Sequence, residues 1–150
     1  MSYNIQLTDK IMDITNSITP AERLFRMHLA RFTNPDMTDE AYGELFTADA
    51  IQEYPFAPAP YAKELSGRQA ITDYISNVVK GATDWDFKNF VFSSTSDPDT
   101  IFVEFEGSAN VTATGKPYRQ IYIGRMTVKE NKISCYREFW NPIWIMDAFV

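Results

Sequence analysis

The spacing of apolar residues changes from a helical to a strand period at Gly81, and this change constrains the fold more than any other feature. Before Gly81, Ile71, Tyr74, Ile75 and Val78 recur every three or four residues, which is the pattern of one helix face. After Gly81, apolar and polar residues alternate with period two, which indicates strands. These predicted strands cover residues 85–94, 100–114, 117–129 and 132–141. Because helices come first and strands last, the sequence predicts an α+β fold, a curved antiparallel sheet covered by about three helices.

Two motifs indicate where the main helices begin. T-P-A-E at residues 19–22 is typical of a helix start, because Thr19 can cap the helix and Glu22 can bond back to the cap. S-G-R-Q at residues 66–69 predicts the same capping box for a later helix. The first of these helices presents one apolar face, formed by Leu24, Phe25, His28, Leu29 and Phe32.

The remaining segments complete one predicted domain over residues 1–150. Apolar residues at helical spacing predict a helical extension over residues 1–18, and a short helix is expected over residues 38–46. A strand over residues 50–56 runs into a proline-rich loop. Residues 142–150 form a tail too apolar to lie free in water, so it should pack over a pocket mouth or onto a partner subunit.

Charge and cysteine content exclude several classes of protein. The net charge of −6 argues against nucleic-acid binding, which depends on neutralising phosphates with Lys and Arg. No segment approaches the ~20 apolar residues of a membrane span, and no signal peptide is visible. Cys135 is the single cysteine, so no internal disulfide forms and a cytoplasmic location is expected. With one cysteine and one histidine, a zinc cluster is not expected, and neither a metal nor a cofactor is predicted.

Aromatic residues make up 15% of the chain, which fits an aromatic-lined cavity or an oligomer interface as well as an ordinary core. Strand alternation divides residues 117–129 into two faces. One face suits a covered, concave surface and carries Tyr118, Gln120, Tyr122, Met126 and Val128. In the last strand, Tyr136, Glu138 and Trp140 join this face if the two strands pair in the expected register, whereas Ile133, Cys135, Arg137 and Phe139 face outward.

Glu138 is the candidate catalytic residue. A carboxylate among Tyr122, Tyr136 and Trp140 is partly desolvated, which raises its pKa and lets it move protons near neutral pH. The alternative is an exposed salt bridge with one of the arginines at positions 119, 125 and 137.

Three further residues are candidates for ligand contact. His28 lies on the apolar face of its helix, and Tyr74 lies on that of the later helix; each is alternatively an ordinary core residue. Tyr54 and Glu53 fall on opposite faces of the first strand, and Tyr54 is the better pocket candidate. The full predicted ligand-binding set is His28, Tyr54, Tyr74, Tyr118, Gln120, Tyr122, Tyr136 and Trp140.

The motifs D-A-I-Q-E-Y-P-F-A-P at 49–58, S-G-R-Q-A-I-T-D-Y at 66–74 and R-E-F-W-N-P at 137–142 resemble the nuclear-transport-factor-2-like superfamily. Within it, the chain resembles SnoaL-like proteins and the phenazine biosynthesis A/B group. The resemblance implies a cone-shaped fold that is dimeric through the outer face of its sheet. It also implies that the glutamate of R-E-F, which is Glu138 here, acts as an acid/base. Tyr74 replaces a pocket histidine of that group, and a phenol with a pKa near 10 cannot shuttle protons as imidazole does.

These observations predict a protein that holds a small apolar or aromatic molecule in the concavity of its sheet. Acid/base chemistry of the lyase, isomerase or cyclase type is one reading; a non-catalytic binding module or a dimeric scaffold is the alternative. A homodimer is expected because an apolar sheet face would otherwise be uncovered. That face is predicted to carry Ile101, Val103, Ile121 and Ile123.

Overall fold

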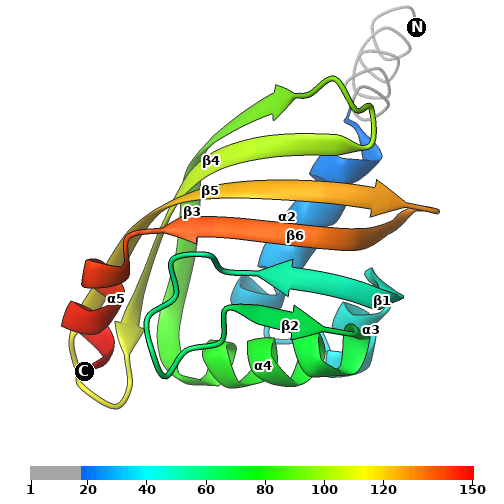
Figure 1. Cartoon of the computed structure of the whole chain (residues 1–150). Coiled ribbons are helices and arrows are strands. Elements are labelled where there is room, and N and C mark those ends of the chain that lie inside the picture. Colours follow the sequence, from blue (N-terminus) through cyan, green and yellow to red (C-terminus); the bar gives the residue numbers. More distant parts are fainter. Residues whose placement is uncertain (1–17) are drawn as a thin grey trace, which may run out of the picture.

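The computed structural model describes residues 18–150, in which six strands form one curved sheet and four helices accompany it (Figure 1). The strands are β1 (Phe46–Glu53), β2 (Glu64–Ser66), β3 (Ala82–Ser94), β4 (Thr100–Val111), β5 (Pro117–Lys129) and β6 (Lys132–Trp140). The helices are α2 (Pro20–Thr33), α3 (Asp39–Gly43), α4 (Arg68–Lys80) and α5 (Pro142–Phe149). The helical extension predicted over residues 1–18 lies almost wholly outside the described residues.

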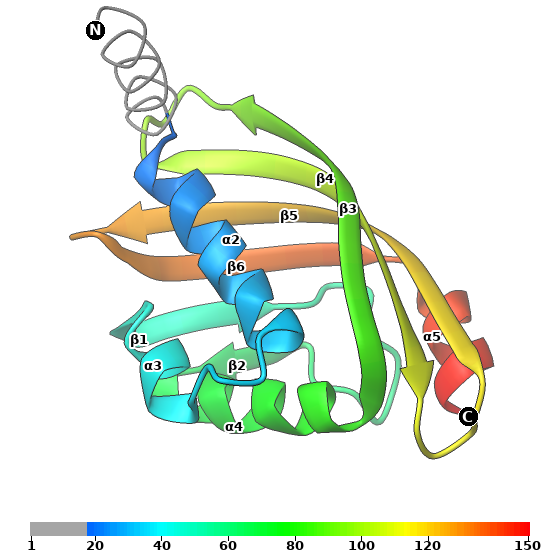
Figure 2. The ribbon, with the colours of Figure 1, turned by 180° about the vertical axis from the view of Figure 1, so that it is seen from behind.

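The predicted α+β fold is confirmed, and the strand order is β2-β1-β6-β5-β4-β3. All neighbouring strands are antiparallel except β1 and β6, which pair parallel. Helices α2, α3 and α4 lie on the concave side, and Figure 2 shows α2 crossing that side of the sheet. Helix α5 lies at one end of the sheet, beside β5 (Figure 1).

The helix starts follow the sequence only in part. Thr19 caps α2 by accepting a 3.2 Å hydrogen bond from the Glu22 amide, but the Glu22 carboxylate pairs with Arg26 instead of the cap. The capping box predicted at Ser66 is wrong. Gly67 is the N-cap of α4, with a φ of 93° that a glycine adopts without strain, and no side chain caps the helix.

The predicted faces of β5 are confirmed, because its residues alternate strictly between buried and accessible. Two other predictions are wrong. Ile133 is fully buried, because a bulge opposite Thr127 and Val128 makes Ser134 an extra residue and turns Ile133 inward. Ile101 and Val103 also face the core, since the outward residues of β4 are the even-numbered ones, Phe102 among them.

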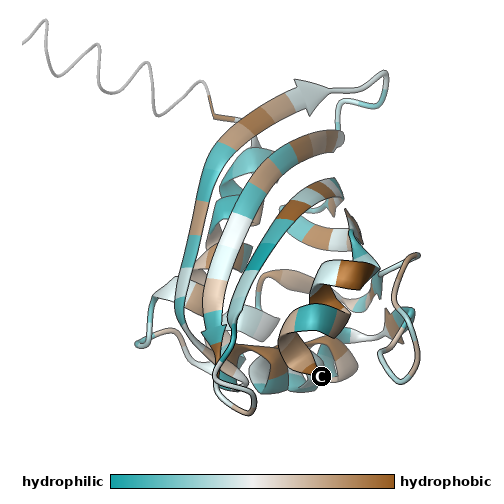
Figure 3. Ribbon diagram, turned by 90° about the vertical axis from the view of Figure 1, so that its left-hand side faces the viewer, coloured by the Kyte–Doolittle hydropathy of each residue, from teal (hydrophilic) through white to brown (hydrophobic). Residues whose placement is uncertain are grey.

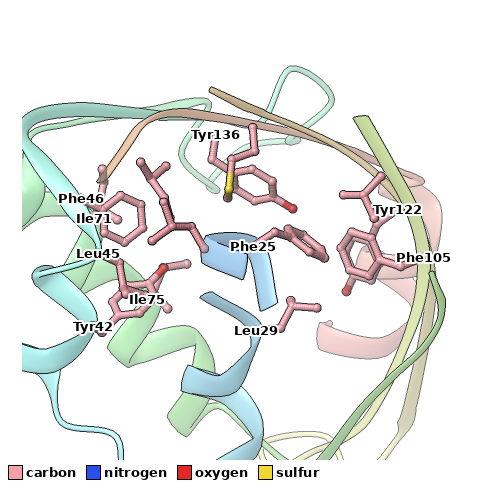
Figure 4. Close-up of a cluster of buried hydrophobic side chains, with 14 of the residues drawn as sticks. Phe25, Leu29, Tyr42, Leu45, Phe46, Ile71, Ile75, Phe105, Tyr122 and Tyr136 are labelled. Carbon is pink, nitrogen blue, oxygen red and sulfur yellow. The ribbon is translucent and has the colours of Figure 1, made fainter. Parts of the chain in front are cut away.

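Figure 4 shows the core between the sheet and the helices. Phe25 of α2 lies beneath Tyr136, with the stacked rings of Phe105 and Tyr122 beside it. Their ring centroids are 4.7 Å apart, a distance typical of aromatic stacking. Coloured by hydropathy, the strands show bands of alternating character along their length (Figure 3). Among residues 18–150, no helix is both long and apolar enough to cross a membrane.

Candidate functional site

A pocket of about 380 Å³ lies between the concave face of the sheet and the helices α2, α4 and α5. This volume falls within the range of small-molecule sites, ~300–1,000 Å³. Its wall is mainly aromatic and aliphatic, with few polar groups. The lining side chains include His28, Leu29, Phe32, Tyr54, Tyr61, Tyr74, Ile75, Trp85, Phe87, Phe105, Tyr118, Tyr122, Glu138, Trp140, Ile145 and Phe149.

Glu138 projects into this pocket from the inner face of β6. Tyr136, two residues earlier on the same face, donates a 2.6 Å hydrogen bond from its hydroxyl to Glu138 Oε2. The residue opposite Glu138 on β5 is Gly124. A Cβ atom at Gly124 would lie 2.8 Å from both Cε2 and Oη of Tyr136, so glycine leaves the space that the Tyr136 ring needs to reach the carboxylate.

Burial decides the charge state of Glu138. The low-polarity surroundings raise its pKa to about 7, against the opposing effect of the Tyr136 hydrogen bond. Among residues 18–150, no lysine or arginine lines the pocket. Arg137 points to the outer face, where it pairs with Glu53 at 2.7 Å. The protonated and ionised forms of Glu138 are therefore close in free energy near neutral pH, so the group can both accept and donate a proton.

Several tyrosines share the wall of this pocket with Glu138, among them Tyr54, Tyr118 and Tyr122. The hydroxyls of Tyr118 and Tyr122 lie 2.8 Å apart and bond to each other. Burial, more than any other cause, raises the pKa of Tyr54, Tyr122 and Tyr136 well above the usual value for a phenol, and the nearby Glu138 charge adds to the rise. These groups keep their protons and can orient a polar end of a ligand.

His28 reaches the pocket from α2 and is neutral. It is 2% exposed, and burial lowers its pKa to about 3. Its Nδ1 lies 2.7 Å from the hydroxyl of Tyr42, which is itself fully buried. His28 therefore carries a single N–H and serves as a polar but uncharged part of the wall.

Most of the predicted site residues meet in this pocket. Those that line it are Glu138, His28, Tyr54, Tyr74, Tyr118, Tyr122 and Trp140. Tyr136 is buried behind Glu138 and reaches the pocket only through that carboxylate. Gln120 departs from the prediction: its side-chain amide binds the backbone N–H and C=O of Asn141, each at 3.0 Å, so it fixes the junction of β6 and α5.

Several wall residues were not predicted. Trp85, Phe87 and Phe105 come from β3 and β4, whose alternation places them on the inner face. Ile145 and Phe149 come from α5, which confirms that the apolar tail packs at the pocket. Strand alternation could have identified Trp85, Phe87 and Phe105. The contacts of Ile145 and Phe149 could not be predicted, because they depend on how α5 is oriented relative to the sheet.

Among residues 18–150, no three His, Cys, Asp or Glu side chains gather in a group that could hold a metal ion.

A larger hollow of about 1050 Å³ lies over the outer face of β3, β4 and β5, next to α5. Its wall mixes apolar surface with many charged side chains, among them Asp84, Asp86, Lys88, Glu106 and Arg119. Tyr118 and Trp144 are the aromatic residues of its lining, whereas the inner pocket is enclosed mainly by aromatic side chains. The smaller inner pocket is therefore the better candidate for a small-molecule site.

The fold and the pocket define a class of protein in which a curved sheet and its helices enclose an aromatic cavity around one carboxyl group. The chain belongs to the SnoaL-like domain family, whose model matches residues 25–136. An uncharacterised protein of Bacillus subtilis, YesE, is 32% identical over 136 residues, which is 91% of each chain. An uncharacterised PhzA/B-like protein of Pseudomonas aeruginosa, PA3332, is 30% identical over 105 residues, 70% of this chain and 74% of that one.

Solved structures share the fold of this chain, two proteins described as NTF2-like among them. The crystal structure of a candidate isomerase from Bacillus subtilis has 31% identity and a TM-score of 0.79, covering 87% of this chain and 92% of that one. A candidate polyketide cyclase from Pseudomonas putida has 16% identity and a TM-score of 0.70, covering 88% and 98%. A Δ5-3-ketosteroid isomerase from Mycobacterium sp. has 16% identity and a TM-score of 0.70, covering 87% and 97%. The last two share the fold alone.

Proposed function

We propose that the chain is a cofactor-free acid/base enzyme, of the isomerase, lyase or cyclase type, acting on a small and largely apolar molecule. The observation that carries this proposal is Glu138, a carboxyl group in an aromatic pocket with a pKa of about 7. A general acid or base works best when its pKa lies near the working pH. Proteins described as isomerases and polyketide cyclases share the fold, which supports the reaction type without fixing it.

The proposed step is a proton relocation. The Glu138 carboxylate takes a proton from a carbon next to a carbonyl group of the substrate, and the electron pair left on carbon delocalises onto the carbonyl oxygen. The protonated Glu138 then returns that proton to another carbon of the same molecule. In the Tyr118–Tyr122 pair one hydroxyl donates to the other, and the hydroxyl that accepts keeps its own O–H free to donate a hydrogen bond to the oxygen while it carries negative charge.

The substrate should be mostly apolar because the wall offers mainly aromatic and aliphatic surface. A pocket of about 380 Å³ suits a molecule of one to three rings. We place this activity in a homodimer in the reducing cytoplasm, since the sheet carries exposed apolar residues on its outer face and the chain holds a single free cysteine.

Proton exchange at carbon provides a direct test that needs no knowledge of the natural substrate. 2-Tetralone in D₂O exchanges its α-protons slowly, and NMR follows the loss of their signal. The wild-type protein should accelerate this exchange, and Glu138→Gln, which keeps the shape of the side chain, should not. Binding of 2-tetralone by both forms, with exchange accelerated by neither, would overturn the enzyme proposal and favour a ligand-binding module.

A further inference from the structure

A chain of buried hydrogen bonds runs from the pocket wall through the core and back to the pocket. The Tyr54 hydroxyl donates to Gln52 Oε1 at 2.6 Å. Gln52 Nε2 donates to the Tyr42 hydroxyl at 3.4 Å, and that hydroxyl lies 2.7 Å from His28 Nδ1. Tyr54 and His28 line the pocket, whereas Gln52 and Tyr42 are fully buried.

The donor and acceptor in each of these hydrogen bonds follow from the first bond, between Tyr54 and Gln52. Because Gln52 Oε1 accepts from Tyr54, its Nε2 group is the end that faces Tyr42, and Nε2 is only a donor. The Tyr42 oxygen then accepts from Gln52, which leaves its own O–H for His28. A neutral imidazole has one N–H and one acceptor nitrogen, so Nδ1 is the acceptor and Nε2 carries the proton.

The Nε2–H group of His28 has no hydrogen-bond partner among the described residues. Two polar side-chain atoms of residues 18–150 are sealed from solvent without a partner, Arg31 Nε and Thr47 Oγ1, and His28 Nε2 is not one of them. Since His28 lines the pocket, this nitrogen retains access to it. A buried donor is stabilised by an acceptor placed opposite it.

We infer that Tyr54, Gln52 and Tyr42 fix His28 as the Nε2–H tautomer, and that this N–H selects ligands whose polar end is a hydrogen-bond acceptor, such as a ketone. Tyr42 and Gln52 are positioning residues that act through His28. The preference for acceptor ligands rests on the proposed function in one respect, namely that this pocket is the ligand site. The tautomer of His28 does not depend on the proposed function.

The tautomer can be observed directly, because His28 is the one histidine of the 150-residue sequence. With the purification tag removed, ¹⁵N-histidine labelling and long-range ¹H–¹⁵N correlation near neutral pH should show Nε2 protonated and Nδ1 unprotonated. Tyr42→Phe keeps the ring and removes the donor, so the Nδ1 resonance should move and Nδ1–H should become populated. Tyr61→Phe removes a pocket hydroxyl that takes no part in the Tyr54–Gln52–Tyr42–His28 hydrogen bonds, so it should leave both imidazole nitrogen resonances in place. An Nδ1–H or doubly protonated ring in the wild type would overturn the inference, as would an unchanged Nδ1 resonance in Tyr42→Phe.

Selection is tested with two molecules of the same shape, 2-acetylnaphthalene, which has a carbonyl acceptor, and 2-isopropenylnaphthalene, which has none. Calorimetry gives the ratio of their affinities in the wild type and in His28→Phe. One hydrogen bond should make this ratio about two- to tenfold more favourable to the ketone in the wild type. An unchanged ratio would overturn the selection. Both results are independent of α-proton exchange, so they stand or fall separately from the proposed catalysis.

Discussion

The Tyr136 hydroxyl donates a 2.6 Å hydrogen bond to Glu138 Oε2, from the same face of the same strand. This bond favours the ionised carboxylate and so lowers the pKa of Glu138, whereas burial favours the neutral acid and raises it. Burial has the larger effect, and the resulting pKa is about 7. Burial and the Tyr136 hydrogen bond together therefore set a pKa at which the charge of Glu138 changes near neutral pH.

Tyr136→Phe should raise the pKa of Glu138 above about 7, because the burial remains and the hydrogen bond that opposes it is lost. The measurement is a pH titration of the glutamate side-chain carboxyl by ¹³C NMR, with the signal assigned by its absence in Glu138→Gln. Tyr122→Phe is the matched control, since the Tyr122 hydroxyl bonds Tyr118 rather than Glu138, and it should change the pKa much less. A lowered pKa in Tyr136→Phe would contradict the assigned role of the bond.

Glu138→Gln should change how stability depends on pH. The pKa of Glu138 is raised to about 7 in the folded state from an ordinary value of 4.5, so the folded state binds the proton more tightly than the unfolded state. Its contribution to stability is fully present below about pH 4.5 and is lost as the pH rises through about 7. The free energy of unfolding of the wild type relative to Glu138→Gln should therefore fall over this window, by at most about 3 kcal/mol.

Urea denaturation of both forms at a series of pH values measures this difference. The contribution of His28 to stability changes with pH in the opposite direction. Because its pKa is lowered in the folded state, His28 contributes stability that is lost as the pH falls below about 6.5. This contribution is common to both forms and cancels in the comparison. A difference that does not vary between pH 4 and 8 would show that Glu138 titrates alike in the folded and unfolded chain.

Gly124→Ala should displace the Tyr136 side chain, because the new Cβ would lie 2.8 Å from its ring atom Cε2 and from its hydroxyl oxygen. Overpacking of this kind costs about 1–3 kcal/mol of stability. It should also raise the pKa of Glu138, since the hydrogen bond from Tyr136 is broken. Gly81→Ala is the control: its Cβ would meet only ordinary contacts of 3.4 Å or more at a φ of −77°, so thermal melting should change little. Equal melting temperatures of the two variants would contradict the close packing at Gly124.

Local patterns predicted most of the fold. Alternation along residues 117–129 gave the two faces of β5 correctly, because its pairing with β4 is regular throughout. The same reasoning failed at Ile133, where one bulge shifts the phase of the strand, and bulges leave no clear signal in a single sequence. The parallel pairing of β1 with β6 brings together residues some 85 positions apart, and alternation carries no information about strand direction.

The sequence predicted which residues of the candidate site share one face of the sheet, but it did not predict the hydrogen bonds between their side chains. Placing Glu138 with Tyr136 and Trp140 followed from period two alone. The role of Gln52 could not be predicted, because its partners Tyr42 and Tyr54 belong to elements whose relative placement depends on the whole fold. For the same reason Gln120 was assigned to the ligand, whereas it binds the backbone of Asn141.

Deletion after Pro142 should lower the free energy of unfolding by several kcal/mol and open the pocket. Helix α5 contributes Ile145 and Phe149 to the pocket wall, and the Phe149 ring packs edge-on against Tyr118 at 5.3 Å. One fully buried large side chain is worth about 1.5–3 kcal/mol. Thermal denaturation measures the loss, and Ile143→Ala is the control, because Ile143 is 65% exposed and should be neutral. An unchanged melting temperature after deletion would show that α5 does not stabilise the fold.

A homodimer should form through the outer face of the sheet. Ile121 and Ile123 are 55% and 40% exposed on β5. The exposed Phe102 lies on β4, the strand beside β5, and the exposed Val91 lies on β3, one strand further along the sheet. Apolar side chains that share a sheet face are stabilised when a second copy covers them.

Glu104 is paired with Ile123 and Arg125 with Phe102, so the same face carries both charges and can complement itself in a twofold pair. Sedimentation at micromolar concentration should therefore give about twice the chain mass of 17.2 kDa. Ile121→Asp places a charge at the centre of the face and should yield a folded monomer, whereas Ile143→Asp, on the exposed side of α5, should leave the dimer intact. A wild-type monomer would contradict this interface. A dimer that survives Ile121→Asp but not Ile143→Asp would move it to α5, where Trp144 and Met146 are also exposed.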